Sequence, residues 1–548
     1  MKKTAAALLT VSLAAAQSPE VVRIGHFPPG TPTTWSFPTG TLPAMEYSMC
    51  TGHVDPASGR EFAVAGASNG ILFVDAIPPY HAWDNLSGVQ LDSWFFADAP
   101  ASRWRGLASF RDHIYATSFM HAGIRTFRID TSGQRSQWIV DLGYDAASQT
   151  QIRSLGPRSC VDQEHGLLYL VGIDPASNAA MLAVYDLFDE SAGTVLEPPT
   201  LLAAWTPGGL IFDVFPKGNL AYVSYQSSAS PGSWRILDVS QLWTNPPATP
   251  FSWNPPFTEW TSTAVANPLS HDSYVSPGGR YWFTVDEGNQ TEGHMIARDM
   301  GASPPVLNNG TMPEPPVVGA YNLVPTGTVA EPMHSLRGIG HTGYVSHWSA
   351  GLHVIDLSAP PGGTNEYPLV TLYDTSTMPP SASIGDGLWD CHPYQDSGVV
   401  YANDSEEGLS LLRLDVGQLN RYGPATPNGA GTPRIEGNAR PPRVGSAYEV
   451  EVTGLQPGNL GALLLALRED PLYMAHSPQT LLGATVLVDL PSSMAFLRVA
   501  DAAGGFAIPF PIPNDPAFAG WKLFLQAFEV TSSNSLAASR GTWFGIAH

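Results

Sequence analysis

Cysteine is scarce in this chain of 548 residues, which contains only Cys50, Cys160 and Cys391. Three cysteines cannot form the disulfide framework of a small secreted domain, although an oxidising compartment permits one bridge. Charge is also sparse, at 14% of residues, and it is unbalanced: 26 basic and 48 acidic residues give a net charge of −22. Because a nucleic-acid partner calls for a basic face, this balance argues against one.

Long apolar runs and helical periodicity are missing as well. No stretch beyond the N-terminus is long and apolar enough to predict a transmembrane segment. Glycine (53) and proline (50) are abundant, which indicates short strands joined by tight turns. A hydrophobic content of 43%, with 15 tryptophans, argues against disorder. The length favours two or more domains.

The N-terminus has the pattern of a bacterial secretory signal. Lys2 and Lys3 are basic, residues 5–15 are mostly apolar, and residues 14–16 are small alanines suited to cleavage. No cysteine follows directly, so a lipid anchor is not predicted. We expect residues 1–16 to be a signal peptide, residues 17–43 to lead into the first domain, and the protein to be exported: secreted, at the cell surface or in the periplasm.

A short pattern recurs along most of the chain: a turn residue, an alternating apolar run and an aspartate. Each run follows another β-rich run across a turn, which predicts a hairpin with an inner strand ahead of it. A period of about 55 residues is typical of β-propeller blades. Seven units predict an all-β fold with a seven-bladed propeller over residues 44–420; six blades with one divergent unit is the alternative. The aspartates are Asp75, Asp130, Asp186, Asp238, Asp299, Asp356 and Asp415.

Inner strands line the channel of a propeller, so residues at one level of different blades converge there. In several units, the residue ten positions before an aromatic residue of the second strand falls on the inner strand, and we expect these residues to lie at one common level of the channel. Cys50 lies near the same level, across a longer turn. Imidazole and thiolate groups together suit zinc or copper. A Cys50–Cys391 disulfide and plain structural packing are the alternatives. The candidate metal ligands are His271, His334, Cys391 and Cys50.

The same units resemble the exported LVIVD-repeat proteins of bacteria, specifically the choice-of-anchor B family. The resemblance spans roughly residues 44–416. It implies an exported β-propeller without an assigned activity, and histidines at the start of several blades, matched here by His271 and His334. Units three and four depart from it, with Pro157 and Phe212 near that place. The stretches that carry the resemblance include LSHDSYVSPGGRYWFTVDE (269–287) and PMHSLRGIGHTGYVSHWSAGLHVIDLS (332–358).

The C-terminal part has a different character. Residues 421–442 are rich in proline and glycine and predict a linker. Strand-like segments over 443–548 predict a small β-sandwich. Within it, DAAGGFAIPFPIPNDPAFAGWKLFLQAF (501–528) resembles an accessory module of bacterial exported proteins.

Catalytic motifs match by letter but not by context. The G-x-S-x-G at 66–70 joins two strands, whereas a nucleophile elbow needs a strand and a helix. No helix follows the G-x-G-x-x-G at 338–343. Two acidic stretches are interpreted as solvated loops, with calcium binding as the alternative. Their acids are Asp286, Glu287 and Glu292, and Asp404, Glu406 and Glu407.

No catalytic residue and no organic cofactor is therefore assigned. The leading hypothesis is a non-enzymatic exported propeller that binds a protein or a glycan at the cell surface. Its rival is a metal-dependent, oxidoreductase-like enzyme that uses the histidines and cysteines of the channel.

Overall fold

The structure is a computed structural model of the chain, and it describes the following residues. These are 21–27, 47–55, 60–68, 70–77, 92–97, 105–118, 123–144, 159–174, 179–227, 230–246, 253–261, 270–276, 279–287, 294–301, 307, 309–311, 313–321, 333–339, 342–357, 367–375, 387–395, 399–414, 420–422, 425–428, 432–437, 442, 445–467, 480–514, 522–533 and 535–545. The predicted signal peptide lies outside them.

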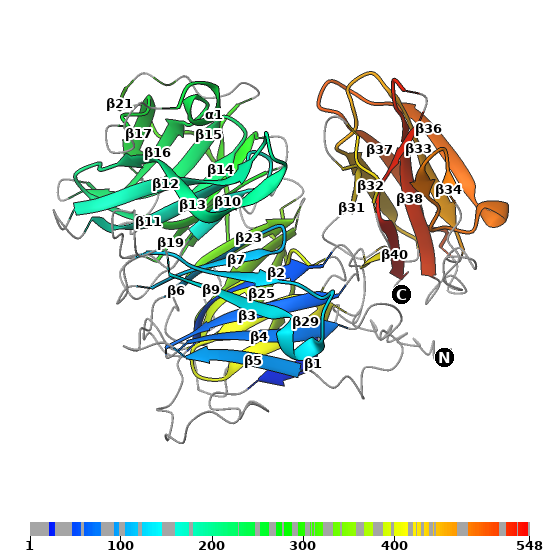
Figure 1. The fold of residues 1–548 in the computed structure, drawn as a ribbon. Helices are drawn as coiled ribbons and strands as arrows, with labels where there is room; N and C mark the ends of the chain where they lie inside the picture. Colours follow the sequence, from blue (N-terminus) through cyan, green and yellow to red (C-terminus); the bar gives the residue numbers. More distant parts are fainter. Residues whose placement is uncertain are drawn as a thin grey trace, which may run out of the picture.

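Seven sheets lie between residues 21 and 414 of the described chain, and we number them blades one to seven from β2 onward (Figure 1). Blades one to four are built from β2 (Tyr47–Val54), β3 (Glu61–Ala67), β4 (Gly70–Ile77), β5 (Asp92–Ala97); β6 (Arg105–Phe110), β7 (His113–Ser118), β8 (Arg125–Ile129), β9 (Ile139–Tyr144); β10 (Ser159–Asp162), β11 (Leu167–Asp174), β12 (Ala179–Asp189), β13 (Thr194–Trp205); and β14 (Leu210–Lys217), β15 (Leu220–Ser227), β16 (Ser230–Asp238), β17 (Phe257–Thr261), β21 (Gly310–Thr311).

Blades five to seven follow the same antiparallel order. Their strands are β18 (Ser270–Val275), β19 (Tyr281–Asp286), β20 (His294–Asp299), β22 (Val317–Tyr321); β23 (Ser335–Ile339), β24 (Thr342–Ser346), β25 (Leu352–Asp356), β26 (Leu369–Tyr373); and β27 (Leu388–His392), β28 (Val400–Asp404), β29 (Gly408–Leu414), β1 (Val21–Phe27). Helical structure in this part is limited to the short segments η3 (Arg135–Gln137) and α1 (Gln241–Thr244) of the described residues. In the described chain no helix is long and apolar enough to cross a bilayer.

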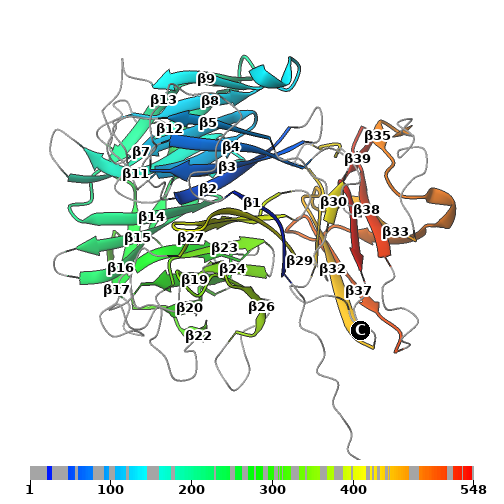
Figure 2. The ribbon, with the colours of Figure 1, turned by 90° about the horizontal axis from the view of Figure 1, so that it is seen from below.

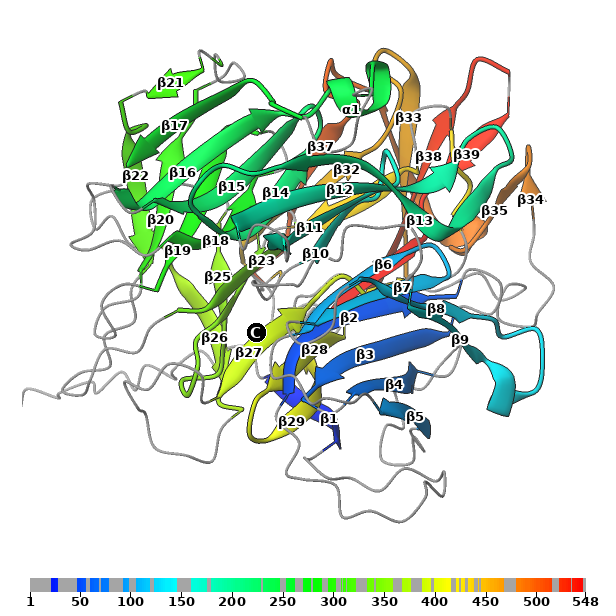
Figure 3. The ribbon, with the colours of Figure 1, turned by 60° about the vertical axis from the view of Figure 1, so that its left-hand side comes forward.

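The innermost strands close a ring. Contacts run from β2 through β6, β10, β14, β18, β23 and β27, and β27 in turn contacts β2 (Figures 2 and 3). Neighbouring blades pack face to face: Phe62 and Phe73 of blade one share an apolar cluster with Leu107 and Phe127 of blade two. Because both faces of a blade are covered, β3 is buried along its whole length. This architecture confirms the predicted β-propeller.

The N-terminal strand completes the last blade. β1 pairs antiparallel with β29, with Val21 opposite Leu414 and Phe27 opposite Leu409. Blade seven takes only three strands from its own repeat, so β29 would otherwise present an unpaired edge. Part of the segment predicted as a lead-in, residues 17–43, is thus the outer strand of the ring.

A β-sandwich follows the ring and lies beside it (Figures 1 and 2). Its two main sheets have the orders β30-β40-β38-β33-β36 and β31-β32-β37. Its elements are β30 (Asn420–Tyr422), β31 (Arg434–Gly437), β32 (Ala447–Thr453), β33 (Leu460–Ala466), β34 (Thr480–Leu481), β35 (Ala484–Thr485), η4 (Leu490–Ser492), β36 (Met494–Val499), β37 (Phe506–Pro511), β38 (Lys522–Val530), β39 (Leu536–Ala538) and β40 (Gly541–Gly545).

The boundary of the sandwich differs from the predicted one. Residues 421–442 were expected to form a linker, yet β30 pairs with β40 and β31 pairs with β32. Ile435 of β31 is buried in the sandwich core with Val450 and Val452. A single buried apolar residue in a short strand suffices to hold such a segment, and proline-rich composition conceals it.

Candidate metal centre

His271 lies at an irregularity in the inner strand of blade five. Ser270 pairs with Asp286 and Asp272 pairs with Val285, so His271 is an extra residue between two paired positions. An extra residue of this kind is a β-bulge, which redirects a side chain away from the regular alternation. The imidazole of His271 thereby meets blade six.

His334 occupies the corresponding place in blade six, one residue before β23. Its backbone N–H donates to the carbonyl oxygen of Ser346, 2.9 Å away. The rings of His271 and His334 lie 4.5 Å apart between centroids, and both side chains are buried. His271 and His334, which the sequence placed at the same level of the channel, therefore lie side by side in the structure.

Backbone carbonyls fix the orientation of both rings. His271 Nδ1 lies 2.7 Å from the carbonyl oxygen of His334, and His334 Nδ1 lies 2.5 Å from that of Trp389. A carbonyl oxygen only accepts hydrogen bonds, so each Nδ1 carries the hydrogen. In the neutral imidazole, Nε2 is then the nitrogen with the lone pair, which is the usual arrangement of metal-binding histidines.

Glu287 completes the cluster. It directly follows β19, and the pairing of Ser270 with Asp286 places it beside the start of β18. Its Oε1 lies 3.9 Å from His271 Nε2. One ligand atom from each of His271, Glu287 and His334 falls within 4.8 Å of the other two.

The environment of Glu287 is unfavourable for a charge. The side chain is buried, and its Oε1 has no hydrogen-bond partner among the described residues. Burial, with a further contribution from the carboxylate of Asp286, raises the pKa of Glu287 to about 8, although the Trp348 side chain favours the charged form. At neutral pH this carboxyl group is mostly protonated, and a cation would displace its proton.

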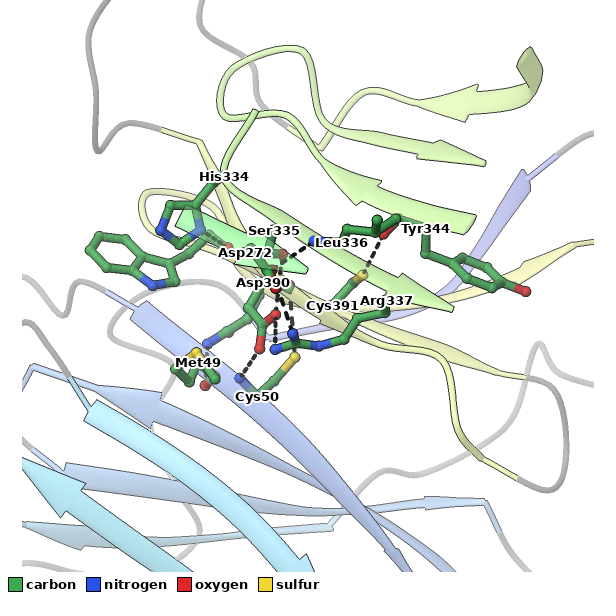
Figure 4. Close-up of polar contacts among 12 residues, drawn as sticks. Met49, Cys50, Asp272, His334, Ser335, Leu336, Arg337, Tyr344, Asp390 and Cys391 are labelled. Carbon is green, nitrogen blue, oxygen red and sulfur yellow. Dashed lines mark hydrogen bonds and ion pairs between the residues drawn. The ribbon is translucent and has the colours of Figure 1, made fainter. Parts of the chain in front are cut away.

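A buried ionic network joins blades five, six and seven through Asp272, Arg337 and Asp390 (Figure 4). Asp272 accepts a hydrogen bond from the backbone N–H of Leu336 at 2.8 Å, and Asp390 accepts one from that of Cys50 at 3.2 Å. Arg337 lies 3.7 Å from Asp272 and 2.6 Å from Asp390. Aspartates on inner strands thus fasten blade five to blade six and blade seven to blade one.

The two cysteines of the predicted site lie elsewhere. Cys50 and Cys391 are both buried, and neither takes part in a disulfide in this structure. The thiol of Cys391 donates to the carbonyl oxygen of Tyr344 at 3.9 Å (Figure 4). The thiol of Cys50 donates to the carbonyl oxygen of Tyr401 at 3.6 Å. The structure therefore assembles the two histidines of the predicted set with Glu287 and leaves both thiols in the packing between blades.

Hairpin length explains why Cys391 was assigned to the wrong level. In blade six Arg337 pairs with Tyr344, whereas in blade seven His392 pairs with Tyr401 across a longer connection. The register of β27 shifts between Leu388 and Asp390, which makes Trp389 the bulged residue equivalent to His271. Counting ten residues back from Tyr401 therefore stops at Cys391, two residues short of this bulge.

Glu287 was missed because it directly follows β19, near the start of an acidic stretch that is typical of a solvated loop. A signal was present nonetheless. In an antiparallel hairpin the end of the second strand lies beside the start of the first, and His271 stands at that start. Antiparallel pairing of the two strands of this hairpin therefore predicts that Glu287 lies near His271.

Comparisons with known proteins give no matching family model and no matching curated protein. Among solved structures, Raptor of Chaetomium thermophilum is 9% identical with a TM-score of 0.42, covering 68% of this chain and 28% of its own. The Cps50 (Swd1) β-propeller domain of Myceliophteria thermophila is 9% identical with a TM-score of 0.39, covering 68% and 99%. The C-terminal WD40 domain of Sif2 is 10% identical with a TM-score of 0.37, covering 68% and 97%. The chain thus spans less than a third of the Raptor chain.

Proposed function

We propose that this chain is an exported binding protein whose propeller holds a divalent transition metal ion through His271, Glu287 and His334. The observation that carries the proposal is the convergence of these three side chains, since one ligand atom of each lies within 4.8 Å of the other two. Both imidazoles donate a hydrogen bond from Nδ1 to a backbone carbonyl oxygen, and the carboxyl group is buried. A buried polar group without a partner costs free energy. A cation at this point would give Glu287 its missing partner.

The dimensions of the cluster fit an ion after a small contraction. Ligand atoms sit roughly 2.0–2.2 Å from zinc, so around a tetrahedral ion they lie about 3.4 Å from one another. The separations in the cluster reach 4.8 Å. Side-chain rotations that move the ligand atoms by about an ångström close this difference.

The donor set favours zinc over copper. The candidate ligands in the sequence include two thiolates, which suit zinc or copper. With Cys50 and Cys391 in the blade packing, the remaining donors are two nitrogens and one oxygen, the set of several zinc proteins. Loss of the soft sulfur ligands removes the argument for copper(I).

Metal analysis tests the proposal directly. Chelator-treated full-length protein should take up one zinc per chain, measured by elemental analysis after desalting and by calorimetric titration. Glu287→Gln and the double variant His271→Ala/His334→Ala should lose this uptake, whereas His294→Ala, in the same blade but outside the cluster, should retain it. Equal uptake by all four proteins, or no uptake by the parent, would overturn the proposal.

Export and the family assignment are part of the same proposal. The signal-like residues 1–16 and the resemblance of residues 44–416 to choice-of-anchor B proteins support an exported location with a protein or glycan ligand at the cell surface. Expression of the full chain in a bacterial host, fractionation and mass analysis of the mature N-terminus would test export. We expect cleavage after Ala16; an intact N-terminus in the cytoplasm would contradict it.

A further inference from the structure

We infer that the sandwich joins two copies of this chain through the outer face of its larger sheet, which contains β33, β36 and β38. This face lies on the side of the sandwich that is turned away from the ring (Figures 1 and 2). It takes no part in the proposed metal site.

Exposed apolar side chains form a row across this face. Val499 of β36 pairs with Leu460 of β33, and the register of β33 with β38 sets Leu460 beside Val530. Val530 in turn pairs with Leu536 of β39, whose backbone N–H donates to the carbonyl oxygen of Leu482. Residues that are directly opposite in neighbouring strands project on the same side of a sheet. The row therefore crosses the sheet without interruption and ends on the hairpin of β34 and β35.

These side chains are unusually accessible for large apolar residues. Together with their neighbours Leu481 and Leu497, the residues of the row other than Leu536 are between 42% and 63% exposed. Single apolar residues on a surface are ordinary, whereas a contiguous patch marks an interaction site. We call this patch the apolar face, and its residues are Leu460, Leu481, Leu482, Leu497, Val499 and Val530.

Leu482 has an unfavourable backbone conformation as well as an exposed side chain. It forms, with Gly483, the two-residue turn between β34 and β35, and the φ angles of the two residues are 47° and 91°. Such left-handed positions favour glycine or asparagine, because a larger side chain is crowded there. A strained and exposed leucine is unfavourable in an isolated chain. Burial of this side chain against a partner would compensate.

The distribution of charge selects a second copy as that partner. The chain has a net charge of −22, so two copies repel each other over most of their surfaces. The residues that alternate onto the outer face from β33, β36 and residues 524–530 include no charged one. Arg498 pairs with Gly461, whose side faces the core residue Phe506. Two copies can therefore approach each other here, and these strands offer no basic group to lipid headgroups.

The size and shape of the apolar face fit a symmetric dimer. Its six residues expose on the order of 500 Å² of apolar surface, toward the upper end of the largest patches on monomers. With exposed polar neighbours such as Thr480 and Ser532, each copy would bury roughly 800 Å², the area of a stable interface. Sheets pack face to face, and a two-fold axis brings the same face of both copies together.

Sedimentation equilibrium of the purified full-length protein tests the dimer. We expect a reversible monomer–dimer equilibrium at micromolar concentrations. Leu482→Asn removes the apolar contact and supplies a residue that the left-handed turn favours. It should weaken the dimer by about 100-fold, roughly tenfold for each of the two copies, while the melting temperature of the monomer stays the same or rises. Leu372→Asn is the matched control, because this leucine is exposed on β26 of the propeller, and it should leave dimerisation unchanged.

A second variant keeps the test decisive if Leu482→Asn disturbs the hairpin. Val499→Glu places a like charge on the exposed strand β36 of both copies and should also give monomers. A parent protein that stays monomeric, or a dimer that both variants leave intact, would overturn the inference. Flotation with phosphatidylcholine vesicles provides the remaining comparison. Vesicle binding by a monomeric parent, lost in both variants, would assign the apolar face to a lipid surface and overturn the dimer.

Discussion

Two buried glutamates, one in each domain, have opposite surroundings. Glu529 in the sandwich accepts hydrogen bonds from the side chains of Asn428 and Asn459 and from the backbone N–H of Gln456. Glu287 in the propeller is buried as well, yet its Oε1 has no such partner among the described residues. Three donors make Glu529 a fixed part of its fold. Because this oxygen has no hydrogen bond of regular geometry, Glu287 is a group that a ligand can complete.

The same contrast extends to the interiors of the two domains. The sandwich packs an apolar core around Val450, Leu463 and Leu525. The propeller buries several ionisable side chains near its inner strands, including Asp272, Asp390, His271 and His334. Inner strands of a ring have no strand partner on the channel side, so side chains must connect one blade to the next. Polar contacts between blades are therefore part of how the ring holds together.

Acidification should produce the largest difference in stability between the two domains. Burial lowers the pKa of His347 and His392 to about 3 and that of His53 and His353 to about 4, all in the propeller. Unfolded histidine titrates near 6.5, so this stability is present above about pH 6.5 and is lost as the pH falls toward 4. No histidine lies among the described residues of the sandwich.

Calorimetry of the full chain between pH 7.5 and 4 would measure this difference. The propeller transition should lose on the order of several kcal/mol, with the sandwich transition changing much less. Parallel loss of both transitions would show that the buried histidines do not determine the acid response.

Matched substitutions of the two glutamates should have opposite effects on stability. Glu529→Gln replaces an acceptor that serves three donors, and we expect the sandwich to lose about 2–3 kcal/mol. Glu287→Gln should stabilise the metal-free propeller at pH 9 and leave it nearly unchanged at pH 4.5. The reason is that the pKa of Glu287 is higher in the folded state than in the unfolded state. The folded propeller has its full stability below the unfolded pKa, and it loses stability as the pH rises through about 8 and the buried carboxyl group ionises.

Domain-resolved thermal unfolding at the two pH values would check the pair. Destabilisation of the metal-free propeller by Glu287→Gln at pH 9 would show that Glu287 has a hidden structural partner, and the comparison of the two glutamates would then fail.

A smaller effect is expected at a glycine between blades five and six. A Cβ on Gly338 would lie 2.2 Å from the ring of Tyr274 on β18. A rigid aromatic ring cannot give way at little cost, so Gly338→Ala should destabilise the propeller by about 2 kcal/mol and spare the sandwich. Gly133→Ala is the control, because its Cβ would meet nothing closer than 3.7 Å. Equal melting temperatures for the two variants would contradict the close packing.

The sequence predicted the features that repeat and missed those that occur once. Runs that end in aspartates such as Asp75 and Asp356 predict the hairpins because strand alternation and turn residues are local signals. The pairing of β1 with β29 joins segments from opposite ends of the ring and has no local signature. The predicted level of Cys391 was wrong because hairpin length varies between blades. The burial of Glu287 was not predicted because burial of an acid in a loop depends on neighbours that are distant in sequence.

The pairing of Val21 with Leu414 also determines when the nascent chain can complete its fold. During synthesis at about 5–20 residues per second, the first strand of the ring waits roughly 20 to 80 s for its partner to emerge. Until then the outer strand of blade seven cannot pair, so the ring cannot be completed. A propeller fastened by its own N-terminus is therefore one whose final folding step is postponed until the seventh blade has been made.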